Sequence, residues 1–471
     1  LGGKLKQTIL QPITGGVKFT EEEMLNKDLS DAYSDMPGAD NYDINNPLLD
    51  NMAIAQEKYT RMATVNAGLE IDLMKDLTFR TAASYMWQQI REDYWDDGST
   101  RQADANQSPY GYGYRNNGEK FSWQVTNTLN YSFNLDDNKH NFSVLLGQET
   151  YYQEKMNLDN EYRKFPSGNF ELNDVAMGTP YEWKSGKNKE GLVSVFGRLS
   201  YNFKERYLFT GTLRADGSSK FARGNQWGIF PSASAAWRIS EEEFLKDVDF
   251  LNNLKLRVGY GTAGNNNIDD NMYTTGYGSG HYGIAGQDYI TFVPGSTLGN
   301  KDLKWEKTTT TNVGLDISLF NSRVNLALDW YNNESSNLLI KNKIPTTTGY
   351  ADQYQNLGSI RNRGFEIVLN TTNIRTKDFT WSTDLNIAIN RSKVLELYGD
   401  ESLDYFIQDY ESRMGDKIEV GKPLGQYYGL LYDGVYTTDD FNQQADGTYR
   451  IKDGVASLKG LDRKKIKPGD A

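Results

Sequence analysis

The chain has 471 residues, a formal net charge of −12, no cysteine and two histidines. An acidic balance argues against nucleic-acid binding, which needs a basic face, and the missing cysteine excludes disulfides and thiolate chemistry. The histidines, His140 and His281, are far apart, which leaves little for a histidine-built metal site or a Ser-His-Asp triad.

Hydropathy excludes one kind of membrane protein only. Hydrophobic residues make up 38% of the chain, and no stretch approaches the roughly 18 apolar residues of a transmembrane helix. Transmembrane strands need only every second residue to be apolar, so they remain possible. The first ten residues lack the apolar core of a signal peptide, so we expect either a protein that is not exported or the interior of a longer chain.

Residues 1–60 are polar and weakly patterned, and we expect a loop region that leads into the first strand. The acidic, Asn-rich stretch 35–51 raises the alternative of a calcium loop. It lacks the D-x-D-x-D-G order and the terminal Glu of such a loop, so a solvated loop is the simpler interpretation.

Residues 61–395 alternate between apolar and polar side chains in twelve segments, which predicts twelve strands in six pairs. The expected strands are 64–73, 77–85, 123–133, 142–146, 192–203, 207–216, 232–239, 254–260, 309–319, 324–330, 365–369 and 381–389.

The links between these segments alternate in length. Links within a pair are short, whereas links between pairs are mostly long, such as 87–120, 153–190 and 262–306. The longest short link contains Ser240 and Glu243 at capping-box spacing, which predicts a short helical turn. Short turns at one end and long loops at the other are typical of an up-and-down outer-membrane barrel. A Greek-key sandwich would not keep this alternation, and a propeller would show a repeat of about 40 to 50 residues.

The hairpin 192–216 carries aromatic residues on both sides of its turn. Tyr201 and Phe203 precede the turn, and Tyr207 and Phe209 follow it. Rings at one height are typical of the aromatic girdle at a membrane interface. From the hairpin alone, an ordinary soluble hairpin with an apolar inner face remains an alternative.

Two motifs suggest chemistry but have simpler explanations. Gly259, Gly261 and Gly264 form G-x-G-x-x-G after a strand, yet no helix or parallel strand follows, so we expect small residues that relieve crowding inside a barrel. The acidic pairs Asp96–Asp97 and Glu241–Glu242 have no evident desolvated partner, so they do not predict an active site.

Aromatic residues in the expected long links are candidate contacts for a ligand or a partner, because flat rings stack on sugar faces and hold peptide side chains. Packing among the loops is the alternative for each of them. The candidates are Trp95, Tyr110, Tyr112, Tyr114, Trp183, Tyr273, Tyr277 and Tyr282.

Ordered motifs across most of residues 60–435 resemble those of SusC/RagA-type TonB-dependent transporters. They include RADGSS (214–219), WG (227–228), FPS (230–232), LKLR (254–257), LKWE (303–306), NLGSI (356–360) and VGKPLG (420–425). The resemblance implies part of an all-β, transmembrane, antiparallel up-and-down β-barrel of about 22 strands around a plug. Residues 396–471 would then form an extracellular loop and a following, truncated barrel segment, within a protein about twice as long as this chain.

The resemblance also implies a function. Such proteins lie in the bacterial outer membrane, import oligosaccharides or peptides, pair with a SusD-like surface lipoprotein that acts as a lid, and are energised by TonB. They are not enzymes, and no cofactor is expected. An alternative from another class is an outer-membrane or secreted all-β adhesin or glycan-binding protein that transports nothing, and an outer-membrane hydrolase is disfavoured by the isolated histidines.

Overall fold

The computed structural model describes residues 51–100, 103, 108, 110–169, 171–284, 287–397, 402–405, 414–429, 434–444, 448–456, 463–464 and 466–469. In this part of the chain the regular structure is almost entirely strand, which confirms the all-β prediction. No helix among these residues has the length and apolar character needed to cross a membrane. The stretch 35–51, where a calcium loop was an alternative, lies outside the described residues except for Asn51.

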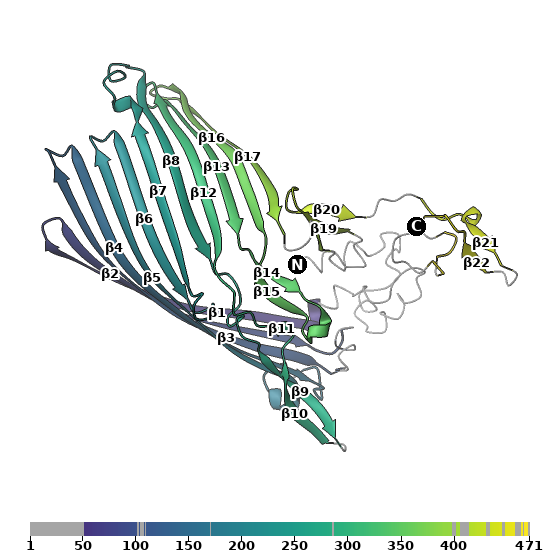
Figure 1. The fold of residues 1–471 in the computed structure, drawn as a ribbon. Coiled ribbons are helices and arrows are strands. Elements are labelled where there is room, and N and C mark those ends of the chain that lie inside the picture. Colours follow the sequence, from purple (N-terminus) through teal and green to yellow (C-terminus); the bar gives the residue numbers. More distant parts are fainter. Residues whose placement is uncertain are drawn as a thin grey trace. The chain divides into compact units, whose positions relative to one another are not determined.

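Twelve strands form one sheet in which almost every strand lies beside the next one in the sequence (Figure 1). The sheet order is β1-β2-β3-β4-β5-β6-β7-β8-β12-β13-β16-β17, as an up-and-down meander requires. The bounds are β1 Ile54–Met74, β2 Leu77–Asp96, β3 Tyr112–Leu135, β4 His140–Arg163, β5 Thr179–Phe203, β6 Tyr207–Ser218, β7 Trp227–Arg238, β8 Leu251–Asn265, β12 Glu306–Leu319, β13 Val324–Ser336, β16 Ser359–Arg375 and β17 Thr380–Glu396.

The alternation of link lengths is confirmed. Within pairs, the chain turns in two to four residues after β1, β3, β5, β12 and β16, and β7 connects to β8 through the longer turn 239–250. Several turn residues have positive φ angles, among them Asp76, Asn138 and Lys204, which closes the chain tightly enough for antiparallel pairing. Figure 1 shows these turns together at one end of the sheet and the long links at the other.

Strands β2 to β5 are longer than predicted, with 20 to 25 residues each. The expected links 87–120 and 153–190 are therefore wrong in extent, because pairing continues from Trp87 with Phe121 as far as Asp96 with Tyr112. The same happens between β4 and β5, up to Arg163 with Thr179. Backbone hydrogen bonds do not need apolar side chains. Strand pairing therefore continues along the chain beyond the residues whose apolar and polar side chains alternate. β1 likewise begins at Ile54, within the region predicted to lead into the barrel.

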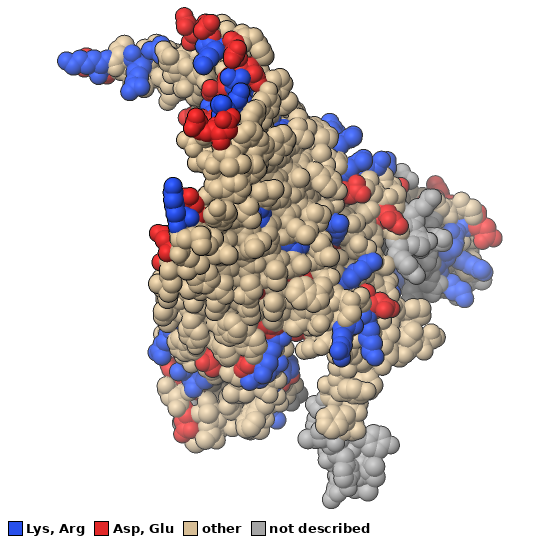
Figure 2. Space-filling view, turned by 60° about the vertical axis from the view of Figure 1, so that its left-hand side comes forward, with Lys and Arg blue, Asp and Glu red and all other residues tan. Residues whose placement is uncertain are grey.

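One face of the sheet, here called the outward face, carries the apolar side chains. Register places Leu213, Leu199 and Leu146 on this face, and all three are at least half exposed. Exposed apolar side chains in this number would be unfavourable in water and are expected against lipid. In Figure 2 one face of the molecule shows a wide uncharged area with charged side chains gathered above and below it.

The predicted aromatic girdle is confirmed and is wider than the hairpin suggested. Rings on five neighbouring strands stack at the turn end of the outward face, which we call the lower band. Its stacked pairs are Phe133–Phe142 at 4.9 Å, Phe142–Tyr201 at 4.6 Å, Tyr201–Phe209 at 6.3 Å, Phe203–Tyr207 at 6.2 Å and Tyr207–Trp237 at 6.3 Å between ring centroids.

A second group of rings, the upper band, lies further along the same face. Trp123 and Tyr152 are stacked with centroids 6.0 Å apart, and Phe121 lies 6.0 Å from Tyr152. Tyr152 follows Phe142 by ten residues on β4 (152 − 142). Ten residues span about 33 Å along a strand, or about 25 Å across a membrane at the usual tilt, which matches the apolar band of such barrels.

The belt between the bands also contains a satisfied polar pair. Asn127 donates to Gln148 at 3.0 Å, and Gln148 donates to Thr150 at 2.6 Å. Because an unpaired amide in hydrocarbon is costly, this chain of hydrogen bonds from Asn127 through Gln148 to Thr150 is what allows amides on this face.

The glycine motif lies within β8, which pairs antiparallel with β7 and β12, so it does not form a phosphate-binding loop. A Cβ at Gly259 would collide with the Asn312 carboxamide, and one at Gly261 would lie 2.9 Å from the Ser232 Cβ. The prediction that these glycines relieve crowding is confirmed.

The helical turn predicted near Ser240 is present as a 3-10 turn, η3, at Ile239–Glu241. The capping box predicted for Ser240 and Glu243 does not form. Arg238 is the N-cap residue, and the Ser240 hydroxyl has no hydrogen-bond partner among the described residues.

The remaining strands form smaller sheets that are separate from the twelve-stranded sheet. They are β9 Tyr277–Ile284 with β10 Gln287–Pro294, β11 Thr297–Leu298 with β14 Leu339–Lys343 and β15 Asp352–Asn356, β18 Ser402–Tyr405 with β19 Met414–Glu419 and β20 Gln426–Gly429, and β21 Phe441–Gln443 with β22 Tyr449–Ile451. Further short 3-10 turns are η2 Val175–Met177, η4 Thr346–Thr348 and η5 Thr438–Asp440. Two compact units contain these elements: the first comprises the described residues up to Leu357 with Gly364–Ile389, and the second Gly358–Arg363 with those from Asn390. The second unit has a small core of Phe441, Ile451 and Ile466.

Candidate functional site

The inward face of the sheet is polar, and its charges are paired across strands. Arg257 on β8 donates through Nε and Nη2 to the two carboxylate oxygens of Asp316 on β12, both at 2.8 Å. Its Nη2 also reaches Asp329 on β13 at 3.1 Å. Gly314 leaves the room for this arrangement, because a Cβ there would lie 2.7 Å from the guanidinium carbon.

A second inward network lies on β4, β5 and β6. Arg214 donates to Asp216 at 2.7 Å, to Ser194 at 2.8 Å and to Glu149 at 3.2 Å. Arg214 and Asp216 belong to the RADGSS motif, so this part of the motif joins three strands on the inward face. Charges held in this way suit a solvated interior, and they are not aimed at one reacting atom.

The long links of the first unit share a core of their own. Phe221, Ile268 and Leu303 are buried together, and Trp305 packs against them and donates its indole N–H to the Gln226 carbonyl at 2.8 Å. Asn356 donates to the Lys304 and Asn337 carbonyls at 2.8 and 2.9 Å. The LKWE and NLGSI motifs therefore hold the long links together at the long-link end of the twelve-stranded sheet.

An ion pair ties one link to the wall at the same end. Lys220 lies 2.9 Å from Glu190 at the upper part of β5 and 3.9 Å from Asp270 in the link after β8. Burial raises the pKa of the Asp270 carboxyl. Its Oδ1 atom has no hydrogen-bond partner among the described residues. Lys220 is the cation that offsets both carboxylates.

Of the eight predicted contact residues, Trp95, Tyr112, Tyr114 and Trp183 lie in strands and not in links, since pairing extends further than expected. Trp95 is 5% exposed in a core with Tyr162, Phe165 and Leu172. For Trp95, packing in this core, which β2, β4 and the link after β4 form together, is the role that the structure supports.

Tyr112 and Tyr114 face inward together with Tyr94, which was not among the predicted contact residues. The rings of Tyr94 and Tyr114 are stacked at 4.9 Å, and Tyr94 and Tyr112 are 5.6 Å apart. Tyr94 could have been found only by knowing that β2 continues to Asp96, because its parity then matches the inward residues of that strand.

The other candidates are not gathered into one site. Tyr110 is 60% exposed, Trp183 is 67% exposed on the outward face, and Tyr277 is 71% exposed at the start of β9. Tyr273 lies half-buried in the link before β9. Tyr282 pairs with Tyr289 through the backbone of β9 and β10, and its side chain lies outside the described part.

The acidic pairs and His140 have structural roles. Asp96 is fully buried and accepts from Thr100 and from the Gly98 N–H, which closes the turn after β2. Glu242 accepts from Tyr207 and Trp237, and His140 hydrogen bonds to Tyr201 at 2.8 Å within the lower band. No group of three or more potential metal ligands occurs among the residues that the structure describes.

Comparison with known proteins agrees with this architecture. The family model for the β-barrel of TonB dependent receptor-like proteins matches residues 14–457. TonB-dependent receptor SusC of Bacteroides thetaiotaomicron is 37% identical over 330 residues, covering 67% of this chain and 31% of that protein. TonB-dependent receptor P3 of Formosa agariphila is 33% identical over 351 residues, covering 71% of this chain and 33% of that protein.

A structure of the RagAB peptide transporter shares the fold, with a TM-score of 0.73, 24% identity, and coverage of 86% of this chain and 43% of that chain. The chain spans about a third of the length of the two curated relatives. The matched family consists of receptors and transporters and not of enzymes. Since the family model covers most of the sequence and the fold agrees, the chain belongs to the TonB-dependent receptor-like β-barrel family.

Proposed function

We propose that the protein containing this chain is an active importer of the bacterial outer membrane. In this proposal it takes up oligosaccharides or peptides, is energised by TonB, and works with a SusD-like surface lipoprotein as its lid. The chain supplies neighbouring strands of the barrel wall, with outer-membrane lipid against the outward face.

One observation carries the proposal: the sheet is apolar on its outward face and ion-paired on its inward face. Leu315 and Leu328 face outward from β12 and β13, while Asp316 and Asp329 on the same strands share Arg257 on the inward side. Such a wall fits lipid on one side and a hydrated, plugged interior on the other. Relatives named SusC and RagAB support the class of transporter.

Ligand contact is assigned to the exposed rings of the long-link end. Tyr110 and Tyr277 are the most accessible of the candidates that we place there, whereas Trp95 is buried in the core that β2, β4 and the link after β4 form. Trp183 is exposed on the outward side, which fits contact with a neighbouring protein better than contact with cargo. In this mechanism ligand is captured between lid and loops, and TonB then displaces the plug.

Uptake by intact cells tests this function. Cells that express the full-length protein receive radiolabelled oligosaccharides or peptides, with and without TonB or a protonophore. Accumulation that depends on both TonB and the proton gradient is expected. Surface binding without accumulation would overturn the importer and favour the adhesin alternative. Tyr277→Ala should weaken ligand binding, whereas Tyr260→Ala, an outward residue of β8, should leave it unchanged.

A further inference from the structure

The part of β5 nearest the long links has a neighbouring strand on one side only. β5 pairs with β4 from end to end, whereas β6 ends at Ser218, opposite Leu192. The last hydrogen bonds on the β6 side join Gly191 and Ser219. The Ser219 N–H donates to the Gly191 carbonyl, and the Gly191 N–H donates to the Ser219 hydroxyl, both at 2.9 Å. Residues 183–189 therefore form a free edge of the sheet.

The backbone groups of this free edge follow from Gly191, whose N–H and C=O both point to the side of β6. Along a strand, the backbone groups of every second residue point to the same side. The free edge therefore presents the N–H and C=O groups of Trp183, Ser185, Lys187 and Lys189. None of these groups has a hydrogen-bond partner among the residues that the structure describes. They form a row of donors and acceptors about 20 Å long.

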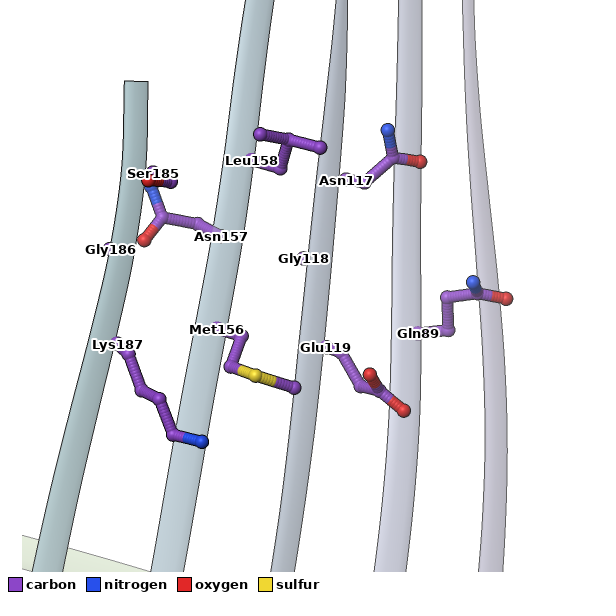
Figure 3. Close-up of a pocket in the computed structure, with 10 residues that line it drawn as sticks. All are labelled: Gln89, Asn117, Gly118, Glu119, Met156, Asn157, Leu158, Ser185, Gly186 and Lys187. Carbon is purple, nitrogen blue, oxygen red and sulfur yellow. The ribbon is translucent and has the colours of Figure 1, made fainter. Parts of the chain in front are cut away.

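The free edge lies beyond the lipid-facing belt. Gly191 is opposite Tyr152 of the upper band, and the free edge continues from there towards the long-link end. Figure 3 shows Ser185, Gly186 and Lys187 on the strand at the left of the view, with β4 beside it. Unpaired backbone groups are not tolerated in hydrocarbon, but above the band water or another polypeptide can reach them.

The side chains along the free edge suit contact with a protein. Trp183 is 67% exposed and faces outward. The segment 183–189 contains three lysines and no acidic residue. Each lysine contacts a carboxylate of β4 or β5, yet each side chain stays more than half exposed, and these are Lys184, Lys187 and Lys189. A strand laid along this edge is therefore expected to place an apolar residue beside Trp183 and acidic residues beside the lysines.

We propose that the free edge of β5 is a docking site for the SusD-like lipoprotein, which adds an extended segment to the sheet as a further strand. A polypeptide main chain matches a row of alternating N–H and C=O groups, and an unpaired edge is a template for such pairing. The lid is the occupant, since many main-chain hydrogen bonds hold a lasting partner, whereas cargo must be released into the barrel. This inference rests on the lid partner of the proposed function.

Hydrogen exchange of single amides tests the docking site. The full-length protein is measured alone and in complex with its SusD-like lipoprotein. Alone, the amides that point to the free edge should exchange quickly, and those between them, which pair with β4, should exchange slowly. In the complex, the edge amides should become slow as well. Unchanged exchange in the complex would overturn the proposal. Slow exchange in the protein alone would also overturn it, because another part of the same polypeptide would then cover the edge.

A proline substitution tests the same contact by affinity. Ser185→Pro removes one edge N–H and leaves the pairing with β4 intact, since proline is tolerated where the N–H faces away from the sheet. It should weaken binding of the lipoprotein about tenfold, because a carbonyl of the partner loses its donor. Ser185→Ala keeps the N–H and should bind the lipoprotein as wild type does. Urea unfolding of both variants should match wild type.

Equal binding of the lipoprotein by the two Ser185 variants would overturn the docking site. Protection of the edge amides that needs an added peptide cargo, and not the lipoprotein, would also overturn it. A complex with protected edge amides in cells that show no TonB-dependent uptake would refute the importer and leave the docking site standing, so the two proposals fail separately.

Discussion

Arg257 illustrates how single residues organise the inward face. Its planar guanidinium matches the carboxylate of Asp316 with two parallel hydrogen bonds and still reaches Asp329, a geometry that lysine would not reproduce. Gly314 is part of the same arrangement, because any larger residue at this position would occupy the space of the Arg257 guanidinium.

Arg257→Met should therefore destabilise the barrel. The change leaves Asp316 and Asp329 as neighbouring carboxylates without a cation, at a cost of about 1 to 3 kcal/mol. Urea unfolding from lipid vesicles measures the loss. Adding Asp316→Asn should recover part of it, and an additive double variant would contradict the coupling.

The two faces predict opposite responses to the same substitution. Leu213→Arg places a charge in the lipid belt and should reduce stability by about 2 to 4 kcal/mol near mid-membrane. Thr212→Arg, one residue earlier and facing inward, should be mild. Insertion efficiency and urea midpoints of both variants provide the measurement, and equal effects would contradict the assignment of the faces.

At the scale of elements, the turn 239–250 holds the lower band in place. Glu242 accepts the Tyr207 hydroxyl at 2.7 Å, the Trp237 indole N–H at 2.9 Å and an Arg206 N–H at 3.2 Å. One carboxylate thus fixes two rings of the band and the hairpin beside it.

These hydrogen bonds, first that of Tyr207 and then that of Trp237, lower the pKa of Glu242 below its usual value. A lowered carboxyl pKa contributes stability at neutral pH that is lost as the pH falls through the lowered value. Glu242→Gln should lower the melting temperature at pH 7 and make it less sensitive to acid between about pH 5 and 3. Melting curves of both proteins across this range test it, and parallel curves would exclude the role.

On the scale of the whole molecule, the two bands fix how the wall sits in a membrane. The outward belt on β4 runs from Phe142 to Tyr152, with Leu146 near its middle. Since the chain lacks cysteine, single-cysteine spin labels can be placed along this strand without background from this region.

Labels at 144, 146, 148 and 150 should be accessible to oxygen in the bilayer, with a maximum at 146 or 148. A label at 149, which faces inward, should report a polar setting. Electron paramagnetic resonance with oxygen and a nickel chelate measures both accessibilities. A maximum outside 142–152 would contradict the placement of the membrane.

The sequence could predict a large share of this fold because the relevant signals are local. Alternation in 207–216 shows which side of a strand is apolar, and short polar turns such as Lys204–Arg206 show where a hairpin closes. The aromatic girdle could be predicted for the same reason, since Tyr201 and Phe209 flank one turn.

Candidate contacts were harder to predict, because their setting depends on distant segments. Trp95 appeared to belong to a polar link, but β2 and β3 remain paired up to Asp96 and Tyr112, and residues beyond 160 then cover the ring. Trp95 is buried and Tyr277 is exposed, and no local sequence pattern predicts this difference in exposure.

By itself, the sequence determined a two-faced antiparallel wall with twelve strands, short turns at one end and a lower aromatic band, because period-two patterning and turn chemistry act between near neighbours. Only the tertiary structure decided where pairing ends, which rings are buried, and which charges meet. Arg257 with Asp329, and Lys187 with Glu154, come from different strands. Their contact depends on register between strands, which is fixed by the whole sheet.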